Sequence, residues 1–176
     1  MIAELHRTDH PECLLARLLN STDSPTPYLA GSLPHPPSTA DTHRADLLHL
    51  TTRHLQKPLD ATKEHGPAAR LVVWHCRLAH PVDQAVLGDG QWARAATAIA
   101  RTGRFASPEH EDGPRWVALR TGPDRLDLVA VLLTEDGRAH PAPQPSEVAA
   151  LCRRLTAELT SSAAPGSLPV RRIRGW

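Results

Sequence analysis

Residues 115–133 read RWVALRTGPDRLDLVAVLL, and this stretch decides the fold. Its two halves, Arg115–Arg120 and Arg125–Leu133, are rich in the apolar and β-branched side chains that are typical of β-strands. Between them, Thr121-Gly122-Pro123-Asp124 consists of residue types that form tight turns. Two strands joined by so short a turn pair antiparallel. We therefore predict a β-hairpin over this stretch.

Two further strands are predicted upstream of the hairpin. The sequence LVVWHCRL, residues 71–78, is bounded by Gly66-Pro67 and by Pro81, and its β-branched and aromatic content favours a strand. Alternate side chains share one face of a strand. One face here carries Leu71, Val73, His75 and Arg77. Residues 1–6, MIAELH, are the other predicted strand.

Apolar side chains at helical spacing predict the helices. They run over Pro11–Leu19, over about His43–Leu55, from Asp89 to Gly103, and from Ser146 to Ala164-Pro165-Gly166. We expect Asp89 and Ser146 to cap their helices, and Gly103 to end its helix in the left-handed conformation. From about residue 20 to residue 42 the composition is rich in Pro, Ser and Thr, which predicts a long loop.

The expected order of elements is strand, helix, loop, helix, strand, helix, hairpin and helix. This order favours an α+β fold in which helices pack on one face of a mainly antiparallel sheet. We expect one domain over residues 1–164, a length that can bury a core without disulfides or a structural metal. Residues 165–176 form a basic C-terminal tail that contains Arg171, Arg172 and Arg174.

Composition argues against several classes of protein. A run of about 18 apolar residues and a charged leader before an apolar segment are both missing, so we expect a cytoplasmic protein without a membrane span. The cysteines, Cys13, Cys76 and Cys152, are spaced neither as a disulfide framework nor as a zinc site. The histidines form no helical HxxxH or HExxH pair, and we expect no metal and no cofactor.

The net charge of +1 comes from the basic tail. Residues 1–70 carry 7 Lys or Arg against 8 Asp or Glu, and residues 71–164 carry 10 against 11. Contacts to phosphates supply most of the non-specific affinity for nucleic acids. A slightly acidic body therefore disfavours strong DNA binding unless basic side chains gather locally.

Several short segments follow one another at a specific order and spacing over roughly residues 65–160. They are Trp74-His75, Asp83, Gln91-Trp92-Ala93, Arg115–Arg120, Asp124, Leu128-Val129-Ala130 and Glu135-Asp136-Gly137-Arg138. In these segments the chain resembles the relaxase/mobilization nuclease family of actinobacterial plasmids and conjugative elements. In that family a tyrosine attacks a DNA phosphodiester, while a divalent metal held by three histidines polarises the phosphate. The resemblance implies a relaxase-like domain.

The chain departs from this family at its catalytic groups. His75 matches the third histidine of the family's metal site, but Arg125 and Asp127 stand where the His-x-His pair is expected. Arg17 lies in the stretch where the family has its nucleophilic tyrosine. Arginine has no lone pair for a metal and repels one. The resemblance thus implies a degenerate relaxase that does not nick DNA by metal-dependent chemistry.

The remaining candidate residues have alternative interpretations. We expect Asp127 to form a polar contact with Arg125 or with His75 in place of the metal. Tyr28, the only tyrosine, falls in the predicted loop, where we expect it to pack partly on the sheet. The candidates for DNA or ligand binding are Arg77, Arg115, Arg120 and Arg125, although such arginines are often only solvent-facing.

Three functions stay open at this point. The first is a DNA-binding or accessory protein whose partner is single-stranded DNA or a relaxosome-type protein. The second is an enzyme of another class that binds a small molecule and uses His75 as acid or base, with Asp127 orienting it. The third is an interaction domain without any site. Fold alone does not decide among them.

Overall fold

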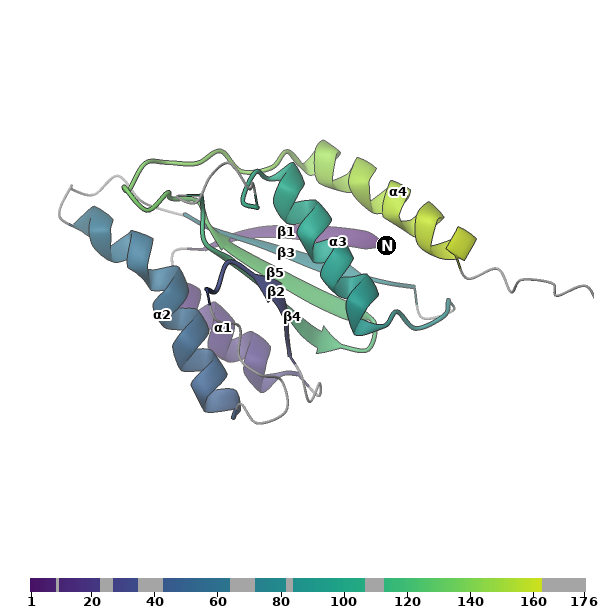
Figure 1. Ribbon diagram of the computed structural model, residues 1–176, viewed down its shortest axis with the longest axis horizontal. Helices are drawn as coiled ribbons and strands as arrows, with labels where there is room; N and C mark the ends of the chain where they lie inside the picture. The colour runs from purple at the N-terminus through teal and green to yellow at the C-terminus, as the bar shows by residue number, and fades with distance from the viewer. Residues whose placement is uncertain are drawn as a thin grey trace, which may run out of the picture.

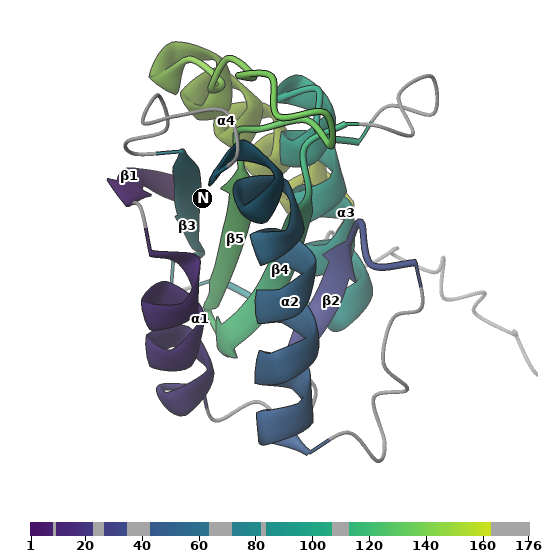
Figure 2. The same cartoon turned by 90° about the vertical axis from the view of Figure 1, so that its left-hand side faces the viewer.

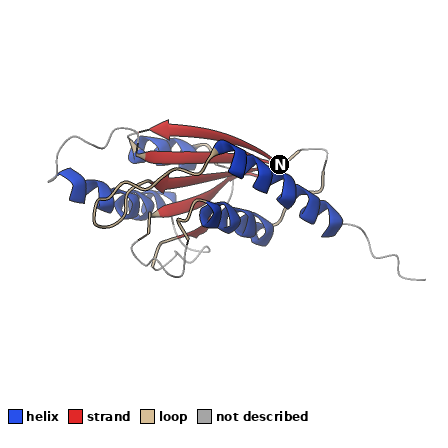
Figure 3. Ribbon diagram, turned by 90° about the horizontal axis from the view of Figure 1, so that it is seen from above, coloured by secondary structure: helices blue, strands red, loops and turns tan. Residues whose placement is uncertain are grey.

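The computed structural model describes residues 1–8, 10–22, 27–34, 43–63, 72–81, 84–106 and 113–162 (Figure 1). The strands within these ranges are β1 (Ile2–Thr8), β2 (Tyr28–Gly31), β3 (Val73–Ala79), β4 (Trp116–Gly122) and β5 (Arg125–Val131). The helices are α1 (Pro11–Asn20), α2 (Arg44–Lys63), α3 (Asp89–Thr102) and α4 (Pro145–Ser162). The strands lie side by side in the order β1-β3-β5-β4-β2, and every neighbouring pair is antiparallel (Figure 3). The predicted α+β class with an antiparallel sheet is confirmed.

The hairpin of β4 and β5 forms as predicted, with a shorter connection. The pairing shifts register between Arg120 and Gly122, so β4 continues to Gly122 and only Pro123 and Asp124 connect the strands. A register shift of this kind adds a residue to one strand and bends it locally. Thr121 lies on the same face as Val117 and Leu119, which is the face of the candidate site described below.

The helices lie on both faces of this sheet, which corrects the expectation of one covered face. In Figure 2, α1 and α2 lie nearer the viewer than β3 and β5, while α3 and α4 lie beyond the sheet. One buried cluster joins α1 and α2 to Val73, Val129 and Val131. A second joins α3 and α4 to residues that alternate with these valines, including Trp74 and Leu128. Both faces of β3 and β5 carry apolar side chains, and these side chains are removed from water only if helices cover both faces.

Strand β2 lies within the stretch that was predicted to be a loop. It forms the edge of the sheet beside β4, and Tyr28 at its start is 7% exposed. A Cβ added to Gly31 would lie 2.7 Å from the carbonyl oxygen of Trp116, so only glycine allows this close approach. A strand of four residues flanked by prolines has too little pattern to be recognised before its partner is known. Residues 23–26 and 35–42 of the predicted loop lie outside the described residues.

The ends of three helices, α2, α3 and α4, differ from the predictions. Helix α2 continues to Lys63 despite Pro58. Gly103 follows α3 as expected, but its φ is −77°, and Arg104 adopts the left-handed conformation with φ 58°. Phe105 and Pro143 pack against Gly103 so closely that an added Cβ would lie 2.8 Å from each, which explains the glycine by space rather than by backbone angle.

Helix α3 begins after Gly88 rather than after a capping Asp89. The side chain of Gln91 accepts a hydrogen bond from the Gly88 N–H at 2.9 Å, which stabilises this start. Ser146 lies inside α4, which begins at Pro145, and the side chain of Glu147 accepts a hydrogen bond from the Gln144 N–H at 3.0 Å. The apolar stripe that helical spacing predicts for α4 consists of Val148, Leu151, Cys152, Leu155 and Leu159. The first three are buried and Leu155 is partly buried, whereas the side chain of Leu159 lies outside the described part.

Among the described residues, no helix combines the length and the apolar composition that crossing a membrane requires. The basic tail, including Arg171, Arg172 and Arg174, lies outside the described residues.

Candidate functional site

A buried histidine and aspartate form the polar centre of the face covered by α1 and α2. His75 projects from β3 and Asp127 from β5. The residue directly opposite Asp127 is Arg77, which follows His75 by two positions on β3. His75 Nε2 and Asp127 Oδ1 are 2.6 Å apart, and the two side chains are 2% and 0% exposed. Because a carboxylate only accepts hydrogen bonds, Nε2 carries the proton of this bond, which leaves Nδ1 of the neutral ring with a lone pair.

Two more groups hold Asp127. The Nε of Arg77 donates to Oδ1 at 3.0 Å, and the Thr121 hydroxyl donates to Oδ2 at 2.5 Å. Burial raises the pKa of Asp127, but hydrogen bonds from His75 and Thr121 outweigh it, so the pKa lies below its ordinary value. The carboxylate is therefore ionised at neutral pH, in a position without solvent exposure.

Of the two contacts predicted for Asp127, the structure contains the one with His75. Arg125 instead lies with its Nε 3.7 Å from Asp124 Oδ1 at the end of the hairpin, and its side chain is 58% exposed. The difference follows from the register, which places Arg125 opposite Ala79, at the end of β3, rather than opposite His75.

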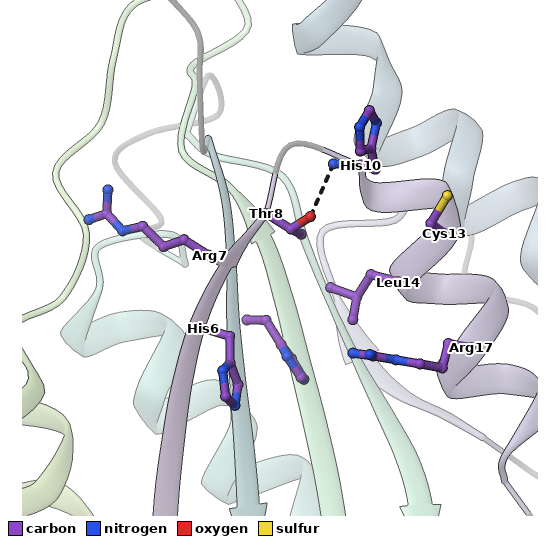
Figure 4. A pocket seen from close by; sticks show the side chains of 8 residues that line it. His6, Arg7, Thr8, His10, Cys13, Leu14 and Arg17 are labelled. Atoms are coloured by element: carbon purple, nitrogen blue, oxygen red, sulfur yellow. Dashed lines mark hydrogen bonds between the residues drawn. The ribbon is translucent and has the colours of Figure 1, made fainter.

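His75 also lines a pocket of about 470 Å³ between β1 and α1 (Figure 4). The described residues that line it are His6, Arg7, Thr8, His10, Cys13, Leu14, Arg17 and His75. The rings of His6 and His75, which are paired across β1 and β3, stack with centroids 5.6 Å apart. From the opposite wall, Arg17 on α1 points towards His6, whereas Arg7 points away from it.

The described residues that line the pocket have basic or neutral side chains, and none of them is a carboxylate. Asp127 lies behind His75 and is fully buried, so its charge is already held by His75, Arg77 and Thr121. Arginine is cationic at all relevant pH values, and neutral imidazoles donate hydrogen bonds through one nitrogen. A ligand with an anionic group therefore suits this pocket.

The four arginines predicted to bind DNA or a ligand are not brought onto one surface. Arg77 contacts Asp127 on the α1 and α2 face. Arg115 pairs with Glu135. Arg120 pairs with Asp89 at the start of α3 and donates to the Leu87 carbonyl at 3.2 Å, on the opposite face of the sheet.

Sequence reasoning did not single out His6 or His10, and it noted Arg17 only as standing in place of a tyrosine. One signal for His6 was present in the sequence, because it alternates with Glu4 in a strand whose intervening residues, Ala3 and Leu5, are apolar. The register that places His6 opposite His75 is a tertiary property.

A second histidine cluster lies where α2 meets β2 and β4. The Ser32 hydroxyl is 2.8 Å from His54 Nε2, and Arg115 Nη1 is 3.1 Å from His54 Nδ1. Arginine only donates, so Nδ1 accepts, and the proton of the neutral ring is on Nε2 and is given to Ser32. In this tautomer the nitrogen that faces Ser32 is already protonated, so His54 cannot take the proton of the Ser32 hydroxyl. The cluster joins three elements and does not form a nucleophilic site.

The pH dependence of stability tests this tautomer. Burial, and then the charge of Arg115, lower the pKa of His54 to about 4 from 6.5. Between these two values the unfolded chain binds a proton that the folded chain does not, so stability that is present above about pH 6.5 is lost as the pH falls towards 4. The shift corresponds to a loss of up to about 3 kcal/mol. Below pH 4 this contribution changes no further.

Urea unfolding at pH 7 and at pH 4.5 measures this loss for the parent chain and for His54→Gln. We expect the variant to lose clearly less stability over this interval, because it lacks the titrating group. Asp127, whose pKa is also lowered, contributes at lower pH, since its stabilisation is lost only below the ordinary range of a carboxyl group. Equal losses in the parent chain and in His54→Gln would contradict the assignment.

No group of three or more His, Cys, Asp and Glu side chains within the described ranges could hold a metal ion. Comparisons with known proteins add no further candidate, because the chain matches no protein-family model, no curated protein and no solved structure.

Proposed function

We propose that this chain is a relaxase-like protein that binds single-stranded DNA without nicking it, and that the pocket between β1 and α1 holds a backbone phosphate. The observation that carries the proposal is the lining of this pocket, in which His6 and Arg17 converge beside His75 and none of the lining side chains among the described residues is a carboxylate. The guanidinium of Arg17 and an imidazole N–H of His6 are suited to phosphate oxygens, because their hydrogen bonds to an anion are charge-assisted, whereas the Nε2–H of His75 is already donated to Asp127.

The position of Tyr28 supports binding without cleavage. It lies in β2, at the edge of the sheet opposite to β1, and it belongs to the buried cluster beneath α1 and α2. Burial raises the pKa of Tyr28 to about 12. A phenol that is buried and harder to ionise is a poor nucleophile. Arg125 and Asp127, which stand where the family's His-x-His pair is expected, are engaged with Asp124 and with His75, as described above.

Fluorescence anisotropy with a labelled single-stranded oligonucleotide tests the proposal. We expect a dissociation constant below about 0.1 mM at low salt, weakening as salt is added. Arg17→Gln should weaken binding roughly tenfold, because it removes one charged hydrogen-bonding group. Arg94→Gln is the matched control, since Arg94 is exposed on α3 across the sheet, and it should leave binding unchanged.

Two results would reject the DNA proposal. One is affinity weaker than about 0.1 mM at low salt, which is below the usual non-specific range. The other is an equal effect of Arg17→Gln and Arg94→Gln, which would place the DNA elsewhere on the surface.

The second candidate function is an enzyme that acts on a small anionic molecule in the same pocket. It is favoured by the pair of His75 and Asp127, because a carboxylate that orients an imidazole is a familiar acid–base arrangement. The volume of about 470 Å³ lies in the range of small-molecule sites. Competition with a free nucleoside monophosphate in the anisotropy experiment separates the two. Tight binding of the monophosphate with weak binding of the oligonucleotide would favour this second function.

A further inference from the structure

Strand β1 is an open edge of the sheet. It pairs with β3 through seven successive residues, from Ile2 opposite Ala79 to Thr8 opposite Val73, without a register shift. Among the described residues, no strand pairs with the other side of β1. Its outer N–H and C=O groups are therefore free to pair with another strand.

β1 lacks two devices that commonly protect such an edge. It contains no proline, and its pairing with β3 shows no bulge. On the pocket side of the sheet, Ile2, Glu4 and His6 are exposed, and Ile2 reaches 66%. On the other side Ala3 and Leu5 are only half-buried, although α4 packs nearby and Thr156 binds the N-terminal amine at 2.7 Å. Both faces of this strand thus have apolar surface left to bury.

We propose that β1 pairs antiparallel with β1 of a second copy of this chain. The register that uses the whole strand is centred on Leu5, because residues 2 and 8 are then opposite each other. In this register Glu4 faces His6 of the partner subunit, and Leu5 faces Leu5 of the partner subunit on the two-fold axis. Opposite charges or hydrogen-bonding groups directly across an antiparallel pair stabilise it. This register follows from the length of the strand alone, and it also places complementary side chains opposite each other.

The dimer brings the candidate sites of the two subunits next to each other. Residues that lie opposite each other in an antiparallel pair share one face of the sheet, so both pockets lie on the same face of a continuous sheet. The two β1 strands are then about 5 Å apart, and each carries its exposed His6 towards the shared surface. Helices α1 of the two subunits flank this surface, and each presents its Arg17. Two anion pockets side by side suit a polymer with repeated phosphates better than one isolated phosphate.

Sedimentation equilibrium of the full chain, without nucleic acid, tests the pairing. We expect a monomer–dimer equilibrium, and we expect Glu4→Lys and His6→Glu each to weaken the dimer by roughly tenfold or more. His6→Glu places two carboxylates opposite each other, and Glu4→Lys removes the carboxylate that accepts from His6. The double variant Glu4→Lys, His6→Glu places Lys opposite Glu again and should recover most of the affinity. Asp46→Lys, an equal charge change at an exposed site on α2, should have no effect.

A monomer at all concentrations up to several hundred micromolar would overturn the proposal. Single variants that weaken the dimer without recovery in the double variant would overturn the register. Circular dichroism identifies any variant that fails to fold, and Glu4→Gln, which removes only the charge, then serves as the milder replacement and should weaken the dimer less. The dimer does not depend on DNA binding, so failure of the anisotropy experiment leaves this result unaffected.

Discussion

Replacing Asp127 by alanine is expected to lower the free energy of unfolding by about 3–5 kcal/mol, because it removes one partner from a buried network of charges. Asp127 is 0% exposed and accepts from His75, Arg77 and Thr121. Without it, His75 Nε2 loses its hydrogen-bond partner on a side chain that is only 2% exposed. Urea unfolding of the parent chain and the variant at pH 7 measures the loss.

Asp124→Ala is the matched control for this prediction. Asp124 is on the same hairpin, and its nearest cation, Arg125, lies 3.7 Å away at a partly exposed position. Such surface pairs contribute at most about 1 kcal/mol. Losses of similar size for Asp127→Ala and Asp124→Ala would show that the buried network is not formed. Asp127→Asn, which keeps the shape but not the charge, should fall between the two.

Replacing Trp92 by alanine is expected to cost about 3–5 kcal/mol, because it empties a large volume in the core between the sheet and α3. Trp92 is 0% exposed, and its ring lies edge-on to His80 with centroids 6.4 Å apart. The surrounding residues come from several elements, including β3 and β5, so they cannot close the space by moving one helix. Thermal or urea unfolding measures the loss.

Two variants bracket this effect. Trp92→Phe should cost less, roughly 1–2 kcal/mol. The smaller ring leaves some space unfilled, but the indole N–H that is lost has no hydrogen-bond partner among the described residues, so its removal breaks no hydrogen bond. Arg94→Ala, on the exposed side of the same helix, should change stability by no more than about 0.5 kcal/mol. A small effect of Trp92→Ala would contradict the second core, and with it the covering of both faces of the sheet.

Much of the fold could be predicted from the sequence because its signals are local. The hairpin of β4 and β5 follows from two apolar runs around a turn, and α3 follows from the helical spacing of Trp92, Ala95, Ala96 and Ile99. Element ends were less predictable. Helix α2 passes Pro58, and the four residues of β2 depend on pairing with β4, which no local pattern contains.

The candidate site could be predicted only in part. The contact of His75 with Asp127 was one of two alternatives, and the register between β3 and β5 selected it. The wall formed by His6 and Arg17 was not predicted, because these residues are far from His75 in sequence and meet it only when β1 pairs with β3 and α1 packs beside them. The arginines point in directions that periodicity alone does not fix, and each of the four lies beside a carboxylate.

By itself, the sequence determined the four helices and every strand except β2, and it placed His75 and Asp127 on strands, because side-chain periodicity and turn chemistry act over a few residues. Only the tertiary structure decided that helices cover both faces, that β2 completes the sheet, and that a basic pocket adjoins His75. The physical reason is that burial, strand register and side-chain direction depend on residues that are far apart in the sequence and come together only on folding.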